Sequence, residues 1–124
     1  MPVRLFIICL FVVSCSSSKM METDLYFGQS RPDGSLITET EWNNFKNSHI
    51  LRIYKEGSTT ISAKGSWLDP ETHKLISEPT YVVSYLHKRS SQISKQIDSL
   101  RNLYKNMFQQ QSILRVDRKV QASF

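Results

Sequence analysis

The pattern of apolar and polar positions divides the chain into an apolar leader and a series of short elements that alternate in character. Residues 5–13 form an unbroken apolar run after Arg4, and the chain turns polar at Ser14. As a helix, these nine residues would cover roughly 14 Å at about 1.5 Å per residue, about half of a hydrocarbon core. The run is therefore too short to span a membrane and is typical of a secretory signal peptide.

Downstream of residue 23, aromatic and β-branched runs separated by turn residues predict β-strands. A turn is expected at Arg31–Gly34, where Pro presets φ and Gly accepts positive φ. Pro79 is expected to interrupt the chain before residues 81–87, which have the strongest strand pattern. This strand is apolar on both faces, which indicates a central position in the sheet. The expected strands are residues 25–28, 59–67, 73–76 as a hairpin arm, 81–87 and 112–117, the last extending towards Phe124.

The first helix is predicted by its start signal. Thr38 and Glu41 have the spacing of a capping box, and Ile37 and Trp42 have the spacing of a hydrophobic staple. These four residues predict a helix over about residues 39–47.

A second helix is predicted by an apolar stripe with spacings of four and three residues over about residues 91–110. Residues 50–56 leave two interpretations open, a loop that packs on the core or an extra helical turn. The stripe consists of Ile93, Ile97, Leu100, Tyr104 and Met107, all expected in the core.

The resulting order, β-α-β-β-α-β, predicts an α+β fold of the ferredoxin-like class. Its antiparallel sheet would carry two helices on one face, with the first and third strands at the centre. The predicted organisation is a signal peptide over residues 1–14, a lipidated tether over 15–23 and one α+β domain over 24–124.

The end of the leader predicts where the protein resides. Val12-Val13-Ser14-Cys15 resembles the lipobox of bacterial lipoproteins. That resemblance implies a diacylglycerol thioether on Cys15, cleavage before it and a membrane anchor of two or more acyl chains. The alternative is ordinary signal cleavage nearby, which would release a secreted protein. Cys9 would leave with the signal peptide, so no disulfide is expected in the domain. We expect a lipid-anchored protein that faces the periplasm or the cell exterior.

Charge adds little to this picture. The formal net charge is +5 and the basic residues are scattered along the chain. Export removes nucleic acid from the plausible partners, so the basic residues indicate either a solvated surface or attraction to anionic lipid or envelope polymer.

No catalytic motif appears. His49, His73 and His87 have no His or Cys two to four residues away, so no metal or other cofactor is predicted. The carboxylate pairs Glu39/Glu41 and Asp69/Glu71 are better explained by helix capping and a turn.

One strand face carries a candidate site. Side chains alternate between the two faces of a strand. We assign Leu25, Phe27, Val82, Leu86, Leu114 and Val116 to the face that the helices cover. The alternation then places a set of polar and aromatic side chains on the open face. Three interpretations compete: a surface for a second copy or an envelope protein, a plain solvated face, or a ligand pocket with Arg115 as the charged anchor. The candidate residues are Tyr26, Tyr81, Tyr85, His87, Arg115 and Asp117.

Several short motifs follow one another along the chain, from Leu25-Tyr26-Phe27-Gly28 near the start of the domain to the run at residues 111–117. Together they resemble domain of unknown function family 3574, a family of small exported bacterial proteins. The resemblance covers residues 24–124, and its most specific part is Gln-Ser-Ile-Leu-Arg-Val-Asp at residues 111–117. It implies the fold and no activity. The motifs are Leu25-Tyr26-Phe27-Gly28, Glu41-Trp42, Gly65-Ser66-Trp67, Glu78-Pro79, His87, Tyr104-Lys105 and the 111–117 run.

Together these observations predict a membrane-anchored lipoprotein with a binding domain. The alternative is a small ligand-binding protein or enzyme that uses the open sheet face.

Overall fold

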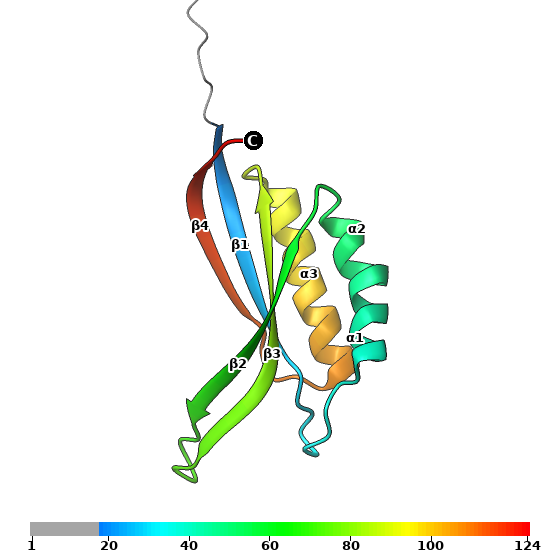
Figure 1. Cartoon of the computed structure of the whole chain (residues 1–124), viewed down its shortest axis with the longest axis vertical. Coiled ribbons are helices and arrows are strands. Elements are labelled where there is room, and N and C mark those ends of the chain that lie inside the picture. Colours follow the sequence, from blue (N-terminus) through cyan, green and yellow to red (C-terminus); the bar gives the residue numbers. More distant parts are fainter. Residues whose placement is uncertain (1–17) are drawn as a thin grey trace, which may run out of the picture.

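A computed structural model describes residues 18–124 as two layers, with a sheet on one side and helices on the other (Figure 1). The predicted signal peptide over residues 1–14 and the predicted lipidation site Cys15 lie outside the described residues. The elements are β1 (Ser18–Gly28), α1 (Glu39–Phe45), the π-helix η1 (Lys46–Ile50), α2 (Leu51–Ile53), β2 (Thr59–Leu68), β3 (Leu75–His87), α3 (Ser91–Phe108) and β4 (Leu114–Ala122).

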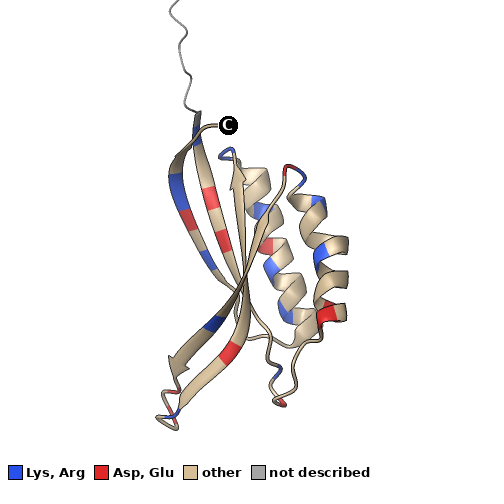
Figure 2. Cartoon of the chain, viewed as in Figure 1, with Lys and Arg blue, Asp and Glu red and all other residues tan. Residues whose placement is uncertain are grey.

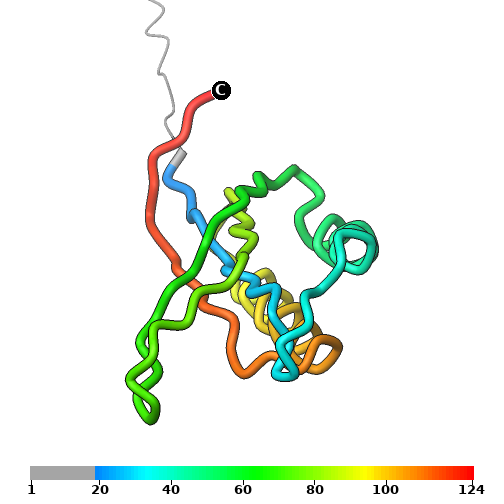
Figure 3. The backbone as a smooth tube through the Cα atoms, turned by 60° about the horizontal axis from the view of Figure 1, so that its bottom comes forward, coloured from blue at the N-terminus to red at the C-terminus, as the bar shows by residue number. Residues whose placement is uncertain are grey.

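The four strands form one antiparallel sheet in the order β2-β3-β1-β4. The predictions of an α+β fold, of helices on one face and of the first and third strands at the centre are confirmed. The β2–β3 hairpin extends beyond the other two strands and away from the helices (Figure 3).

An aromatic cluster joins the two layers. Phe27 on β1 contacts three rings from the helical layer, with centroid distances of 5.4 Å to Trp42, 6.0 Å to Phe45 and 4.8 Å to Tyr104. Edge-on and tilted pairs of this kind are preferred by aromatic rings and add to the stabilisation from burial. All four side chains are 2% exposed or less.

Two strand boundaries differ from the prediction. β1 begins at Ser18, so most of the expected tether over residues 15–23 belongs to the sheet. β3 continues through Pro79, where an interruption was expected. The sheet accommodates Pro79 because β1 ends near this position, and the Pro79 carbonyl accepts a hydrogen bond from Gln29 N at 3.0 Å. Pro79 has no N–H to donate, but on this side of β3 no carbonyl of a neighbouring strand is left without a hydrogen bond by its absence.

The helices follow the local signals closely. Thr38 caps α1 with the predicted capping box, and Ile37 and Trp42 are both buried. α1, η1 and α2 follow one another without a break, so the extra-turn interpretation of residues 50–56 is correct for Leu51–Ile53. The stripe on α3 ends on Phe108, not on Met107, which is 50% exposed. Within residues 18–124, no helix is long and apolar enough to cross a membrane.

Candidate functional site

The pairing register decides which side chains share a face of the sheet. Leu25 lies opposite Val83 on β3 and opposite Arg115 on β4, and Thr23 lies opposite Tyr85 and Asp117. Side chains directly opposite each other point to the same face. Leu25 is fully buried against the helices, so its neighbours across the sheet face the helices too.

The predicted open-face set is therefore wrong in its placement. Tyr81, Tyr85, His87, Arg115 and Asp117 lie on the helix-covered face, and of the six only Tyr26 lies on the open face. Val82, Leu86, Leu114 and Val116, expected against the helices, point away from them. Relative to β1, the strands β3 and β4 are shifted by one residue from the arrangement assumed in the face assignment. A shift of one residue moves every side chain of a strand to the opposite face.

The tyrosines of β3 are packing residues. Tyr81 stacks on Trp42 at a centroid distance of 4.6 Å, and Tyr85 stacks on Tyr54 at 3.9 Å. Burial raises the pKa of Tyr54 far above its usual value and also raises the pKa of Tyr85. Both phenols stay neutral, and neither is poised to transfer a proton near neutral pH.

The structure does bring His87, Arg115 and Asp117 together with Thr23 in a polar cluster, in which Thr23 and His87 are buried and Asp117 lies at the surface. The Thr23 hydroxyl donates to Asp117 Oδ1 at 2.6 Å and lies 2.9 Å from His87 Nε2. His87 Nδ1 lies 2.8 Å from the carbonyl oxygen of Lys88. Each polar atom that faces this cluster from Thr23 and His87 has a partner.

Arg115 connects this cluster to α3. Its Nε donates to Asp117 Oδ2 at 2.9 Å, and its NH1 donates to Asp98 Oδ1 at 3.0 Å. Its NH2 donates to Ser94 Oγ at 3.1 Å. Burial alone would raise the pKa of Asp117, but the Thr23 hydrogen bond and the Arg115 guanidinium outweigh it and lower that pKa. The pKa of Asp98 is lowered in the same way, with Arg101 and Arg115 opposing desolvation.

This cluster is a structural joint between β1, β4 and α3. The Arg115 side chain is only 14% exposed, and its Nε, NH1 and NH2 all donate to protein oxygens, so it is a poor anchor for a ligand. Sequence reasoning missed Thr23, Ser94 and Asp98, because only the strand register and the docking of α3 bring them to Arg115. The Thr23–Asp117 pairing was hidden by assigning residue 23 to the tether.

The open face carries a different set of residues. One apolar side chain from each strand forms a row across the sheet, in which each lies directly opposite the next. The outermost two, Ile61 and Leu114, are 53% and 57% exposed. The row consists of Ile61, Val82, Tyr26 and Leu114.

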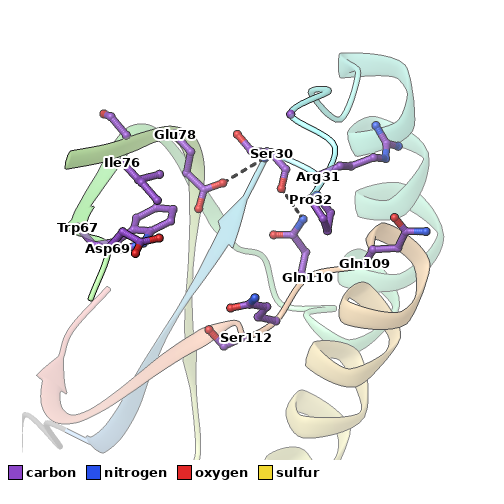
Figure 4. A pocket seen from close by; sticks show the side chains of 13 residues that line it. Ser30, Arg31, Pro32, Trp67, Asp69, Ile76, Glu78, Gln109, Gln110 and Ser112 are labelled. Atoms are coloured by element: carbon purple, nitrogen blue, oxygen red, sulfur yellow. Dashed lines mark hydrogen bonds between the residues drawn. The ribbon is translucent and has the colours of Figure 1, made fainter. Parts of the chain in front are cut away.

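A hollow of about 730 Å³ lies at the end of the molecule where β1 ends, between the β2–β3 hairpin and the loop after α3 (Figure 4). Figure 4 shows Glu78 and Gln110 on opposite sides of Ser30, which lies two residues after the end of β1. The hollow is lined by Ser30, Arg31, Pro32, Gly34, Trp67, Asp69, Ile76, Ser77, Glu78, Gln109, Gln110, Gln111 and Ser112.

Hydrogen bonds hold the floor of the hollow in place. Ser30 N donates to Glu78 Oε2 at 3.1 Å, and Gln110 Nε2 donates to the Ser30 carbonyl at 2.8 Å. The buried Tyr104 hydroxyl donates to the carbonyl of Gly28 at 2.8 Å. A Cβ at Gly28 would lie 2.7 Å from Glu78 Oε1, so the absence of a side chain there makes room for this carboxylate.

The walls of the hollow combine an aromatic ring with carboxylates. Trp67 is 44% exposed, and Glu78 has no ion-pair partner within residues 18–124. Arg31 also lines the hollow, but it donates to Glu41 Oε1 at 2.6 Å and lies over the Phe108 ring. An indole beside carboxylate and amide groups suits a cationic or hydroxyl-rich ligand. Sequence reasoning missed this site, which assembles from three segments far apart in the chain.

Among the described residues, no three His, Cys, Asp or Glu side chains are grouped closely enough to hold a metal ion.

The fold defines a class shared with proteins of known structure. The chain is similar to a phage SAM lyase in complex with S-methyl-5'-thioadenosine, with 13% identity, a TM-score of 0.61 and 81% of each chain covered. The apo state of a phage SAM lyase matches with 12% identity and a TM-score of 0.61, covering 86% of this chain and 92% of that one. CutA from Synechococcus elongatus matches with 9% identity and a TM-score of 0.54, covering 86% and 82%. At these identities the similarity establishes the fold alone.

The sequence places the chain within one family. A family model described as "Protein of unknown function (DUF3574)" matches residues 22–124, so the chain belongs to that family, as its motifs predicted. No curated protein matches the chain in sequence.

Proposed function

We propose that this chain is an exported bacterial lipoprotein, anchored through lipid on Cys15, whose ferredoxin-like domain works by binding. The observation that carries the proposal is the short distance between the anchor and the sheet. Ser18, the first residue of β1, follows Cys15 by three residues, which reach roughly 11 Å at full extension. A lipid on Cys15 would therefore hold this end of the sheet close to the bilayer.

The hollow lies at the opposite end of β1. Eleven residues in β1 give a length of roughly 35 Å at about 3.3 Å per residue. An anchor before one end of β1 would present the hollow, which begins just after the other end, away from the membrane and towards envelope components. We propose that the hollow takes a cationic or hydroxyl-rich group of such a component.

Binding is favoured over catalysis by the state of the reactive side chains. His87 and Asp117 are engaged with Thr23, and the Arg115 guanidinium is engaged by three side chains. A general acid or base must reach a substrate proton. Both ring nitrogens of His87 already have protein partners, and the Asp117 carboxylate is paired with Arg115 and Thr23.

A second copy of the chain is the partner that we propose for the open sheet face. The strands would run away from the membrane, so this face would point sideways and would be accessible to other anchored copies. A two-fold axis along the membrane normal would bring two such faces together with both anchors in one bilayer. The exposed Ile61 and Leu114 would then be covered.

Incorporation of labelled fatty acid in cells tests the anchor. We expect the wild-type chain and the Cys9→Ala variant to carry label, and the Cys15→Ala variant to carry none. Cys9→Ala is the matched control, because it removes the other thiol of the chain. Equal labelling of Cys15→Ala and wild type would refute the proposal.

A further inference from the structure

Charge is distributed unevenly along the long axis of the domain. We define the anchor pole as the end where β1 begins, β4 ends and the loops before α3 and β2 lie (Figure 1). Five basic residues belong to this pole, with Glu56 as the acidic residue of its loops. They are Lys19, Lys55, Lys88, Arg89 and Lys119.

The opposite pole, which contains the hollow and the hairpin tip, is mixed in charge (Figure 2). Its acidic residues outnumber its basic ones, and Arg31 is already paired with Glu41. The acidic residues are Asp33, Asp69, Glu71 and Glu78, and the basic residues are Arg31, Lys64 and Lys74.

The basic side chains of the anchor pole are exposed and available. Lys19, Lys88, Arg89 and Lys119 are all exposed, and none has an ion-pair partner within residues 18–124. Arg118 differs from them, because Asp24 and Glu22 on the open face engage it.

We propose that the anchor pole is a docking surface for the anionic phospholipid headgroups of the membrane that carries the protein. The inference rests on the proposed lipid anchor for its orientation. An anchor at Cys15 would hold Ser18 within roughly 11 Å of the headgroups. Lys88 and Lys119, near the level of Met21 in the sheet, would reach the headgroups once this end of the domain settles on the bilayer. Basic side chains this close to an anionic surface each strengthen binding about fivefold. The lipid on Cys15 and the basic pole would act as two signals for one membrane, which is the combination that gives stable attachment.

Docking also fixes the orientation of the domain. A single flexible attachment would let the domain tilt, whereas contacts from the loop before α3 and from both β1 and β4 define a plane. The sheet then stands upright on the bilayer, and the hollow faces away from it.

The test uses the full chain purified from its native membrane and reconstituted into vesicles of neutral phosphatidylcholine, or of phosphatidylcholine with one quarter phosphatidylglycerol. Lysine acylation is followed by mass spectrometry at each site. We expect Lys88 and Lys119 to react at least threefold more slowly on the anionic vesicles. Lys64 and Lys74, at the other pole, should react equally on both. Equal reactivity of all four lysines on the two vesicle types would overturn the inference.

Charge reversal separates this inference from the anchor. Binding of the full chain to anionic vesicles at low salt should fall at least on the order of 30-fold in Lys88→Glu/Arg89→Glu, since two attractive charges are lost and two repulsive ones are added. The matched control, Lys64→Glu/Lys74→Glu, makes the same charge change at the far pole and should bind as wild type. A chain that fails to float with neutral vesicles refutes the anchor alone. Equal loss in both double variants refutes the docking surface and indicates attraction by net charge only.

Discussion

At the scale of single residues, Thr23 is the side chain whose role is least evident from its type. Its hydroxyl joins His87 on β3 to Asp117 on β4, through contacts of 2.9 Å and 2.6 Å. It is fully buried, so water cannot replace it. A polar atom left without a partner in such a place costs the full desolvation of that atom.

We therefore expect Thr23→Val to lower the free energy of unfolding by about 1–3 kcal/mol. The substitution keeps the shape of the side chain, leaves the buried His87 Nε2 without its partner and removes one hydrogen bond to Asp117, which keeps its bonds to Arg115. Urea unfolding followed by circular dichroism measures the change. Thr60→Val is the matched control, because Thr60 is exposed on β2 and the same substitution there should change stability by less than about 0.5 kcal/mol. Equal effects at the two positions would contradict the role assigned to the Thr23 hydroxyl.

At the scale of elements, Arg115 fixes the distance between β4 and α3 through the carboxylates of Asp98 and Asp117. Both carboxylates have a lowered pKa in the folded protein. A lowered pKa means that the folded state binds the proton less readily than the unfolded state. The resulting stabilisation is present above the ordinary Asp value of about 3.9 and is lost as the pH falls through the folded value.

We accordingly expect the free energy of unfolding to decrease below about pH 4 and Asp117→Asn to flatten that decrease, because the neutral amide has no proton to take up. The measurement is urea unfolding at several pH values between 2.5 and 6. Glu71→Gln, in the exposed hairpin turn, should leave the acid decrease as in wild type. An unchanged decrease in Asp117→Asn would show that another group is responsible.

The elements themselves were largely predictable, because each carries a local signal. The capping box at Thr38, the staple of Ile37 and Trp42, and the stripe on α3 act within one or two helical turns. The errors arose where the outcome depends on distant partners. Pro79 stays within β3 because β1 ends beside it, and no local rule encodes that neighbour.

The candidate site failed for a related reason. Alternation correctly grouped Tyr81, Tyr85 and His87 on one face of their strand, but it does not determine which face meets the helices. β3 is apolar on both faces, so its own pattern left that choice open. The hollow could not be predicted from the sequence, because Ser30, Trp67 and Gln110 come together only when the sheet and α3 are assembled.

At the scale of the whole molecule, the proposed anchor and the sheet geometry together would limit how two copies can meet. If the anchor pole rests on the bilayer, the strands run along the membrane normal and the open face points sideways. Two copies in one membrane can then approach face to face without moving either anchor. The row from Ile61 to Leu114 crosses three strand spacings, roughly 14 Å, and would lie at the centre of the contact.

This arrangement predicts that a cysteine in the middle of the row will link two copies. Sheets packed face to face lie about 10 Å apart, which is beyond the reach of a disulfide but within that of a short bis-maleimide linker. We expect this linker to join two copies of Val82→Cys in membranes from cells that express the full chain, because symmetry brings residue 82 of each copy near the two-fold axis. Lys95→Cys, on the exposed outer face of α3, is the matched control and should remain monomeric. Denaturing electrophoresis distinguishes the two forms. A dimer with both variants would indicate random collision in the membrane, and a dimer with neither would remove the second copy as the partner of the open face.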